Sequence, residues 1–564
     1  MFNVFILTFV IYVVSLLAFP LYRFFITSKY YIVSNALLLL TLLISATSLV
    51  HDLFTLEDKF YITTAVNNYW ANIVDFSFSM ALTPLSLAFG YLVILIGFST
   101  NIYTLNYFKG EADETSFVFW LNAFIASMLT LVLSHNFYSI FLGWELIGLT
   151  SFFLINFWQA KRSTLKSSLK AFSFNLVSDI FLLIALVCFY RVSNTTDCDT
   201  FIYLAIWENL VESAQLQIGL ISLALCASIK SVQIGGHLWL PDSMEAPVPA
   251  SSLIHSATLV SAGIFILSKF NTLFLVMGWS PTLALIGSIT AAYGGVVSAA
   301  QTDLKKLLAY STMSHCGFLW VLACSGDFYI TIFYLFLHGL FKASSFYCAG
   351  SFIRNYGSQD SRLMGNSHTF MRLDTVLFLI CSANLAGLPF TIGYYFKSFF
   401  FKFMVLKIFS SFTIGFLLVG LLSSLIYFFR LTFYVTFDLY KSQKYITMLS
   451  LSNIKKSFTQ LLSVASINHL IAVFILIIFS IFFVTYYHYY YVSTPIMFND
   501  TQLTGWLLFL LKGSILYKSY YLYFYSLYLA IFLLLVFVGY RKSIFALENI
   551  FVFFYIITII LLLL

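Results

Sequence analysis

The sequence predicts an all-α membrane protein with many transmembrane helices. Of its 564 residues, 61% are hydrophobic and 9% are charged, whereas a soluble globular protein carries about 25% charged residues. Apolar runs such as 31–50 and 181–190 lack charges entirely, and roughly 20 such residues can cross a bilayer as a helix. Transmembrane β-strands alternate apolar and polar residues, and these runs do not. We therefore expect a polytopic helix bundle.

Apolar runs between polar breaks predict about 15 or 16 transmembrane spans. In chain order these spans cover residues 3–25, 31–50, 76–100, 115–134, 136–157, 166–190, 216–234, 248–270, 276–299, 304–324, 328–353, 373–402, 406–437, 464–489, 519–540 and 546–564. The main polar connections between them are residues 51–75, 104–114, 191–215, 355–372 and 438–460.

Two of the spans contain helix-breaking residues. One runs into Gly235-Gly236 and a loop that holds Pro241, Pro247 and Pro249, and the other contains Ala386-Gly387-Leu388-Pro389. Gly and Pro weaken or break helices. Interrupted spans at matching places in two halves are typical of transporters built from inverted repeats, although a single proline kink in each half is also common in membrane helices.

The breaks lead to a division of the chain into four parts. We expect N-terminal transmembrane helices in residues 1–114, followed by two inverted five-helix repeats, 115–270 and 276–437, each forming an antiporter-like half-channel. Residues 438–564 would form C-terminal transmembrane helices.

Ionisable residues inside the apolar spans mark a candidate ion path. Of 22 acidic residues, Glu145 and Asp179 fall well inside a span. The deep basic residues are Lys230, His255, His338, Lys342, Lys397 and Arg430. A charge at the bilayer centre costs at least roughly 2.5–3.5 kcal/mol on insertion scales, so such residues usually serve an ion path or meet a partner.

Each of these residues also has a structural interpretation. Glu145 could stay protonated and join two helices, Asp179 could form a structural ion pair, and Lys230 could extend toward the interface. His338 and Lys342 lie four residues apart and so share one helix face. Arg430 keeps its charge and cannot relay protons by titrating.

Lysine and histidine suit proton transfer inside a membrane. Burial favours a neutral amine and a nearby carboxylate favours the ammonium, so a moving carboxylate could load or unload a lysine. Histidine can connect such sites because it titrates near neutral pH.

Cofactor, metal and nucleic-acid sites have no support in the sequence. No two of the seven cysteines share a CxxC spacing, and no GxGxxG or P-loop motif is present, so we expect no metal and no redox cofactor in this chain. The net charge of +7 is dispersed over loops and helix ends, without the dense basic patch of a nucleic-acid-binding protein. Cationic loops usually face the more negative compartment.

Several motifs resemble one known family. They are HLWLPDSMEAPVPASSLIHSATLVSAG at 237–263, FLGWELIGLTSFFLINFW at 141–158, QTDLKKLLAYSTMSHCGF at 301–318, HGLFKASSF at 338–346, QDSRLMGN at 359–366 and NLAGLPFTIGYYFKS at 384–398. In this order they resemble the chain-5 family of NADH:ubiquinone oxidoreductase, respiratory complex I, over roughly residues 76–437.

The resemblance implies an antiporter-like proton channel. In the family's pattern Glu145 and Lys230 form the input pair, and Asp179 sets the potential near Glu145. His255 links Lys230 to the central Lys342, which has His338 beside it, and Lys397 lies at the exit. Protons would then move through this chain while NADH, FMN, iron–sulfur clusters and ubiquinone bind to partner subunits.

The resemblance also implies partners and a location. The partners would be other membrane-arm subunits of complex I, especially the neighbouring antiporter-like chain 4, together with lipids. The implied location is the mitochondrial inner membrane, with a bacterial plasma membrane as the alternative. The abundance of Phe (65) and Tyr (37), which have AT-rich codons, hints at an organelle genome.

The sequence departs from the family at three places in the path. Tyr334 stands where a second histidine is common, Ser398 follows Lys397 where an acid is common, and residues 175–179 lack the family's arginine. The C-terminus departs most, because the family's pattern implies a long lateral helix along the membrane arm before one last span. A helix of about 40 residues spans roughly 60 Å, and residues 438–564 cannot easily supply it besides their spans, so we expect it to be absent or severely shortened. Two other functions stay open. One is the large subunit of a multisubunit sodium/proton antiporter, and the other is a structural subunit whose charges no longer conduct.

Overall fold

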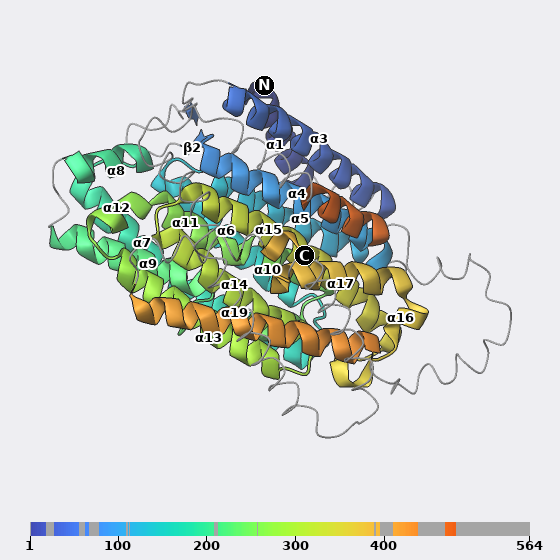
Figure 1. Ribbon diagram of the computed structural model, residues 1–564. Helices are drawn as coiled ribbons and strands as arrows, with labels where there is room; N and C mark the ends of the chain where they lie inside the picture. The colour runs from blue at the N-terminus through green and yellow to red at the C-terminus, as the bar shows by residue number, and fades with distance from the viewer. Residues whose placement is uncertain are drawn as a thin grey trace, which may run out of the picture. The chain divides into compact units, whose positions relative to one another are not determined.

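The computed structural model shows a bundle of long helices (Figure 1). It describes residues 2–17, 28–55, 63–66, 78–108, 111, 113–207, 213–256, 258–388, 391–394, 397, 410–437 and 469–480. Within these ranges, 8 helical segments are long and apolar enough to cross a membrane. The all-α polytopic class is therefore confirmed, with a two-stranded sheet as an addition that the sequence did not predict.

The first half of the described chain contains both long and short helices and one pair of strands. Its elements are α1 (Phe2–Leu17), α3 (Ser28–Thr55), β1 (Thr63–Val66), β2 (Phe78–Ala81), α4 (Pro84–Tyr107), α5 (Glu114–Val132), α6 (Phe137–Ile155), α7 (Arg162–Ser193), α8 (Cys198–Trp207), α9 (Ala214–Lys230), η2 (His237–Trp239), η3 (Asp242–Glu245), α10 (Val248–Ser256) and α11 (Leu259–Lys269). Strands β1 and β2 pair antiparallel, with Thr63 opposite Ala81.

The second half begins with a short helix and continues with longer ones. Its elements are α12 (Asn271–Val276), α13 (Ser280–Ala300), α14 (Leu304–Cys324), α15 (Phe328–Tyr356), η4 (Ser361–Leu363), α16 (Ser367–Phe370), α17 (Arg372–Ala386), α19 (Ser411–Thr432) and the π-helical turn η5 (Phe433–Phe437). A further apolar helix covers His469–Ser480.

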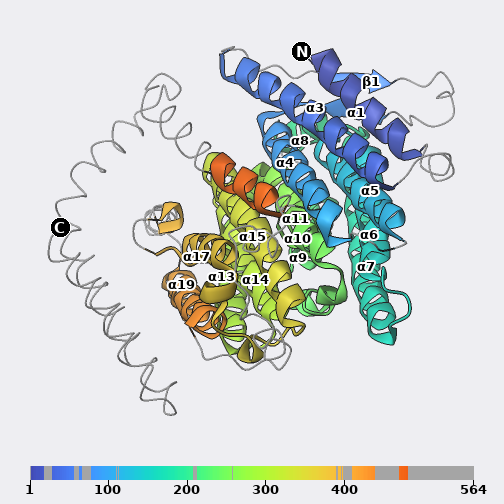
Figure 2. The ribbon, with the colours of Figure 1, turned by 90° about the vertical axis from the view of Figure 1, so that its right-hand side faces the viewer.

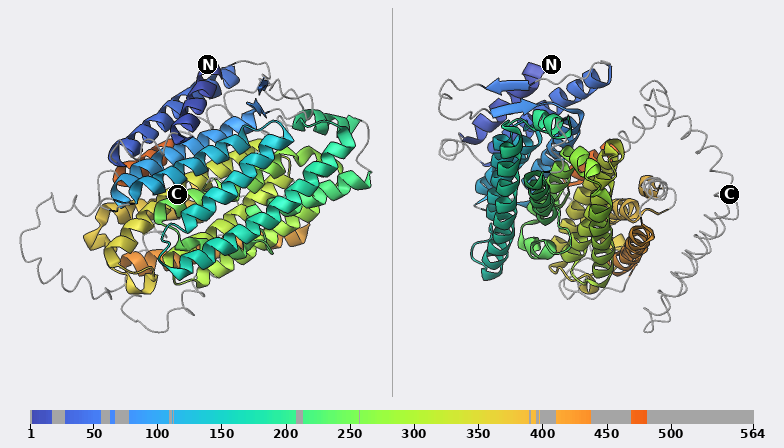
Figure 3. Two further views of the ribbon diagram at one scale, coloured as in Figure 1. Left: turned by 180° about the vertical axis from the view of Figure 1, so that it is seen from behind. Right: turned by 90° about the vertical axis from the view of Figure 1, so that its left-hand side faces the viewer.

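The helices pack in two groups that lie side by side (Figure 2). In the first group, α5 packs against α6 and α7 packs against α9, while in the second group α13 packs against both α14 and α19. Helices α7 and α19 lie on opposite sides of the described bundle, as the two views in Figure 3 show. Helices α10, α14 and α15 occupy its centre, and α14 and α15 carry long runs of buried residues.

Both predicted helix interruptions are confirmed. Helix α9 ends at Lys230, and the chain then turns through Val232 and Gly235, with φ values of 61° and 94°, before the short helices η2 and η3. Helix α17 ends at Ala386, where Gly387 has a φ of 76°. A left-handed Val is unusual because its branched side chain crowds the backbone, so the first turn is strained.

A third interruption lies in a span that the sequence predicted to be continuous. The predicted span 248–270 is divided between α10, which ends at Ser256, and α11, which begins at Leu259. The Thr258 hydroxyl donates to the Leu253 carbonyl at 2.8 Å, and such side-chain bonds compete with the helical ladder. The segment contains no Pro or Gly at this point, so its composition did not indicate an interruption.

Several predictions concern residues outside those described. The prediction of a shortened or absent lateral helix, and the spans at 519–540 and 546–564, fall there. The division into two inverted repeats stays a prediction. The predicted connection 191–215 contains α8, which the sequence did not indicate.

Candidate functional site

Lys230 lies at the end of α9, where the first interruption begins, and it is fully buried. Its Nζ donates to the Trp144 carbonyl at 2.6 Å and lies 3.8 Å from Oδ1 of Asp179. The same Nζ lies 4.1 Å from the centre of the Trp144 ring, a cation–π distance. The Trp144 Nε1 in turn donates to the Ser178 hydroxyl at 3.1 Å, which joins α6 to α7. Lys230 is therefore held by α6 and α7 together.

Glu145 follows Trp144 on α6, but its side chain is exposed on the outer face of the described chain. It is surrounded there by exposed apolar residues of the same helix, Leu142, Leu146 and Leu149. The carboxylate that meets Lys230 is thus Asp179, and Glu145 interacts with both groups only through its longer-range charge. A direct or single-water contact between Glu145 and Lys230 stays a prediction.

His255 occupies the last turn of α10, beside the interruption before α11. Its Nε2 lies 3.1 Å from the Ser243 hydroxyl of η3, and its ring stacks on Phe346 of α15 at a centroid distance of 6.0 Å. Its Nδ1 is buried and has no hydrogen-bond partner among the described residues. His255 therefore connects the segment after Lys230 with the helix that carries Lys342.

Lys342 and His338 lie on the buried part of α15, one turn apart. The Lys342 Nζ donates to the Ser311 hydroxyl of α14 at 2.6 Å, and no carboxylate pairs with it within the described ranges. Both ring nitrogens of His338 are buried and have no hydrogen-bond partner in the described part of the chain. A buried polar group without a partner points to an ordered water or a transient bond.

Lys397 lies beyond the second interruption. Its Nζ donates to the Ala386 carbonyl at the end of α17, at 3.0 Å, and to the Ser424 hydroxyl of α19, at 2.9 Å. A cavity of about 20 Å³ lies between this lysine and His338. That volume is sufficient for about one water molecule. The two residues are therefore placed for an exchange through water.

The sequence reasoning missed His315 of α14, which lines the same cavity. Its Nδ1 lies 2.8 Å from the Tyr334 hydroxyl and its Nε2 lies 3.4 Å from the Tyr427 hydroxyl. Its ring centre lies 5.0 Å from that of His338. Tyr334, which stands where the family often has a histidine, thus contacts a different histidine. His315 could have been found from the sequence, because it is an ionisable residue inside the predicted span 304–324 and within the motif at 301–318.

The two ends of the bundle differ in the number of Lys and Arg residues that they carry. One end, here called the basic end, is where α7 and α14 begin and α15 ends. It carries Lys161, Arg162, Lys166, Lys170, Lys305, Lys306, Arg354 and Arg362. Contacts such as Lys170 to Asp242 at 2.6 Å and Lys305 to the Ala246 carbonyl at 3.0 Å tie its segments together.

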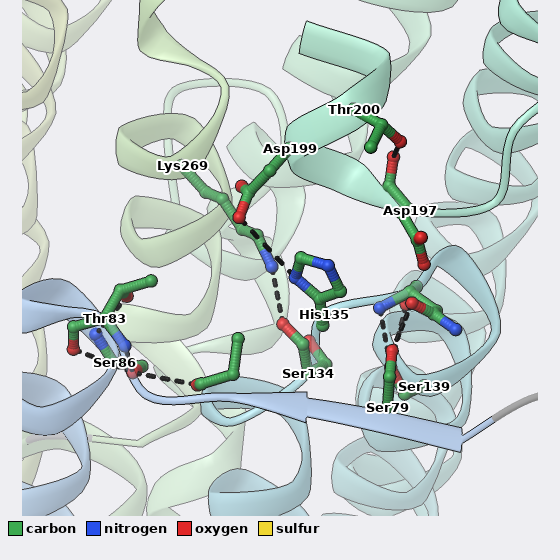
Figure 4. Close-up of polar contacts among 12 residues, drawn as sticks. Ser79, Thr83, Ser86, Ser134, His135, Ser139, Asp197, Asp199, Thr200 and Lys269 are labelled. Atoms are coloured by element: carbon green, nitrogen blue, oxygen red, sulfur yellow. Dashed lines mark hydrogen bonds and ion pairs between the residues drawn. The ribbon is translucent and has the colours of Figure 1, made fainter. Parts of the chain in front are cut away.

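The opposite end, where α5, α7 and α11 finish, carries a smaller polar cluster (Figure 4). There His135 Nδ1 lies 3.6 Å from Oδ2 of Asp199, and the Lys269 Nζ donates to the Ser134 carbonyl at 2.5 Å. Asp199 is the first-turn acid of α8, and Asp197 precedes it. Among the described residues, this end therefore carries fewer Lys and Arg residues than the basic end.

A metal or disulfide site is absent from the described residues. No group of three or more His, Cys, Asp or Glu side chains is placed there to hold a metal ion. All seven cysteines are free thiols, and six of them are buried. Among the described residues, the buried lysines of the site therefore contact a carboxylate or neutral oxygen atoms.

Comparison with known proteins places this arrangement in a family. The profile of the NADH:quinone oxidoreductase/Mrp antiporter transmembrane family matches residues 134–427. NADH-ubiquinone oxidoreductase chain 5 of Paramecium tetraurelia is 42% identical over 412 residues, which are 72% of this chain and 72% of that protein. Chain 5 of Wickerhamomyces canadensis is 34% identical over 68% of this chain and 60% of that protein.

A bacterial relative and a solved structure extend the comparison. NADH-quinone oxidoreductase subunit L of Neisseria meningitidis is 35% identical over 58% of this chain and 51% of that protein. The Mrp complex structure from Dietzia contains a chain with a TM-score of 0.69 and 21% identity, covering 96% of this chain and 63% of that one. The Wickerhamomyces, Neisseria and Dietzia chains are thus matched over less than two thirds of their lengths, and the Dietzia likeness concerns the fold alone. Because the family profile covers more than half of the chain, and the Paramecium match more than two thirds of both proteins, this chain belongs to the family of antiporter-like membrane subunits of NADH:quinone oxidoreductase.

Proposed function

We propose that this chain moves protons across the membrane through Asp179, Lys230, His255, Lys342, His338 and Lys397. The movement is coupled to NADH oxidation and quinone reduction, whose cofactors are held by other subunits of the complex. The observation that carries the proposal is the set of three buried lysines, each with its ammonium on an oxygen atom of a neighbouring helix. Such groups are costly in a membrane and mark ion paths.

The proposed path has a defined chemistry at each lysine. A protonated lysine can give a proton to water and stay as a neutral amine, because the amine keeps two N–H groups and can still donate to the carbonyl or hydroxyl beside it. Lys342 and Lys397 interact electrostatically, so a charge on one disfavours a charge on the other. Successive loading of neighbouring sites would therefore push protons along the path.

The larger number of Lys and Arg residues at the basic end gives the proposed path an orientation. Cytoplasmic or matrix loops of membrane proteins carry an excess of Lys and Arg. The basic end would accordingly face the negative compartment from which protons are taken up, and the end with His135 and Asp199 would face the compartment that receives them. We also propose the mitochondrial inner membrane as the location, in line with the chain-5 relatives from Paramecium and Wickerhamomyces.

The exposed side of α6 supports a membrane partner. Glu145 lies among exposed leucines on this helix, and a carboxylate facing lipid is expensive. A neighbouring membrane-arm subunit that covers this face would shield Glu145 and could carry its proton partner. An antiporter-like chain 4 is the partner that we propose for this position.

The experiment compares Lys342→Met with Arg430→Met in the assembled complex. In sealed membrane vesicles, protons moved and NADH oxidised are measured together, and their ratio is the readout. We expect Lys342→Met to lower the ratio strongly because the proton carrier is lost while much of the side-chain bulk stays. Arg430→Met should leave the ratio near the wild-type value, because that guanidinium donates to the Ala299 carbonyl and cannot titrate in this range. A normal ratio in Lys342→Met together with a large loss in Arg430→Met would refute the path.

A further inference from the structure

A buried acid–base pair lies outside the proposed path. Asp374, in the first turn of α17, is 1% exposed, and His469, at the start of helix 469–480, is 4% exposed. The His469 Nε2 lies 2.9 Å from Oδ1 of Asp374, so the pair joins positions 95 residues apart in sequence. The orange-red helix 469–480 lies beside α4 and α15 in Figures 1 and 2. Hydropathy did not mark these two residues as buried, because both fall near the ends of predicted spans.

The pair keeps two polar atoms without partners. Oδ2 of Asp374 and Nδ1 of His469 are both buried and have no hydrogen-bond partner among the described residues. Native proteins rarely leave such atoms unsatisfied, and an ordered water or a functional role is the common explanation. One atom of each residue is thus available to receive or release a proton.

The charge of the pair depends on a single proton. With Asp374 ionised and His469 neutral the pair carries one negative charge, and no lysine or arginine pairs with it in the described ranges. An uncompensated charge in a buried site is strongly unfavourable. One added proton, on either residue, makes the pair neutral overall. Binding one proton would therefore remove the uncompensated charge of the pair, and the unpartnered Asp374 Oδ2 and His469 Nδ1 are the atoms that could bind or release it.

The position of the pair suits delivery to Lys342. Asp374 lies twelve residues before Ala386 on α17, which is about 18 Å toward the basic end at 1.5 Å per residue. The His469 ring lies 5.5 Å from that of Tyr103, which stacks on Tyr347 at 4.6 Å. Tyr347 is five residues after Lys342 on α15, about 7.5 Å along the helix axis. The pair thus lies between the basic end and the central lysine.

We propose that Asp374 and His469 form a second proton-loading site, which takes protons from the basic end and supplies Lys342. In this step a proton from water binds Nδ1 of His469 or Oδ2 of Asp374, and the same proton later leaves through water toward the neutral amine of Lys342. No bond other than those to the proton changes. The inference rests on the proposed function, in which Lys342 carries protons. It adds a source of protons for Lys342 that is separate from Lys230.

The test uses the ratio of protons moved to NADH oxidised in vesicles that contain the assembled complex. Asp374→Asn keeps an oxygen that can accept from the His469 Nε2 but cannot carry the proton. We expect it to lower the ratio by at least half of the drop caused by Lys342→Met, and Asp374→Glu to restore the ratio. Asp360→Asn is the matched control, since Asp360 lies at the same end in an exposed pair with Arg362 at 2.6 Å; its ratio should equal that of the wild type.

The outcomes separate this inference from the proposed function. A wild-type ratio in Asp374→Asn, while Lys342→Met loses pumping, overturns the loading site and leaves the path intact. A wild-type ratio in Lys342→Met overturns the path itself. If Asp374→Asn fails to assemble, His469→Gln decides by the same ratio. Failure of both variants to assemble would identify the pair as a structural tie between helix 469–480 and α17, which also overturns the proposal.

Discussion

The two helix interruptions hold a lysine by the same means but with different neighbours. At the first, Lys230 donates to the Trp144 carbonyl and also meets the carboxylate of Asp179 and the ring of Trp144. At the second, Lys397 donates to the Ala386 carbonyl and the Ser424 hydroxyl, and no carboxylate pairs with it within the described residues. An ammonium at 230 is therefore balanced by a charge, while an ammonium at 397 meets neutral oxygens in the part of the chain that the structure describes.

The difference assigns different tasks to the two lysines in the proposed path. A balanced ion pair holds its proton until the carboxylate moves or is itself protonated. A lysine that contacts neutral oxygens beside a water-sized cavity has no carboxylate contact to stabilise its ammonium, so it loses its proton to water more easily. We infer that the first interruption controls the timing of proton transfer and that the second is suited to release. The following predictions test this contrast.

The largest effect is expected from removing the charge beside Lys230. Asp179→Asn leaves the fully buried ammonium with no balancing charge, which should cost about 3 kcal/mol of stability, the low end for a broken buried pair because the Asp179 side chain is 18% exposed. Proton yield per NADH should fall along with the amount of assembled complex on native gels. At the second interruption, Ser424→Ala removes one hydrogen bond and should cost only about 1–2 kcal/mol. Equal losses in the two variants would contradict the contrast.

An intermediate effect is expected from a methyl group at the glycines of the two turns. Both Gly387→Ala and Gly235→Ala put a side chain at positive φ, which should cost roughly 1–2 kcal/mol. The new Cβ at 387 would also lie 2.7 Å from Cδ of Lys397, whereas at 235 nothing lies within 4 Å. Gly387→Ala should therefore lower both the thermal midpoint of the complex and its proton yield, while Gly235→Ala lowers only the midpoint. A normal yield in Gly387→Ala would show that Lys397 does not need its present position.

The smallest effect is expected when the ring at the first interruption is replaced by another ring, as in Trp144→Phe. Trp144→Phe keeps a ring face beside Lys230 and loses the hydrogen bond to Ser178, a change of about 1 kcal/mol. Trp144→Leu also loses the cation–π contact, worth about 1–2 kcal/mol more at a desolvated site. The midpoint of thermal unfolding should fall in the order wild type, Phe, Leu. A reversed order would mean that the ring does not stabilise the ammonium.

The sequence predicted the features that depend on local composition. The span 304–324 has the limits of α14, and hydropathy alone located the buried lysines at 230, 342 and 397. Features that depend on distant partners were missed. His315 meets Tyr427 from 112 positions away. Periodicity contains no information about such pairs, because the helices that create them are brought together only by the fold.

Glu145 shows that hydropathy does not predict which side of a helix a residue faces. An acid in the middle of an apolar span was expected to be buried beside Lys230, but the outer face of α6 is itself apolar, so a long apolar run does not tell which side a residue faces. Asp374 shows the reverse case. It lies in the first turn of its helix, near the end of a predicted span, and is nevertheless buried by neighbouring helices. Hydropathy gives the depth of a residue in the membrane but not its direction.

The length of α7 has a consequence for the surrounding lipid. Its 32 residues extend about 48 Å at 1.5 Å per residue, whereas the hydrocarbon core of a bilayer is about 30 Å thick. Its outward residues Leu176, Val177, Ile180 and Leu183 are apolar, and its first turns carry Arg162, Lys166 and Lys170. A helix of this kind must tilt or project its cationic start beyond the hydrocarbon, where it can meet phospholipid head groups. The activity of this subunit should consequently depend on acyl-chain length, because the tilt of α7 sets the position of Asp179.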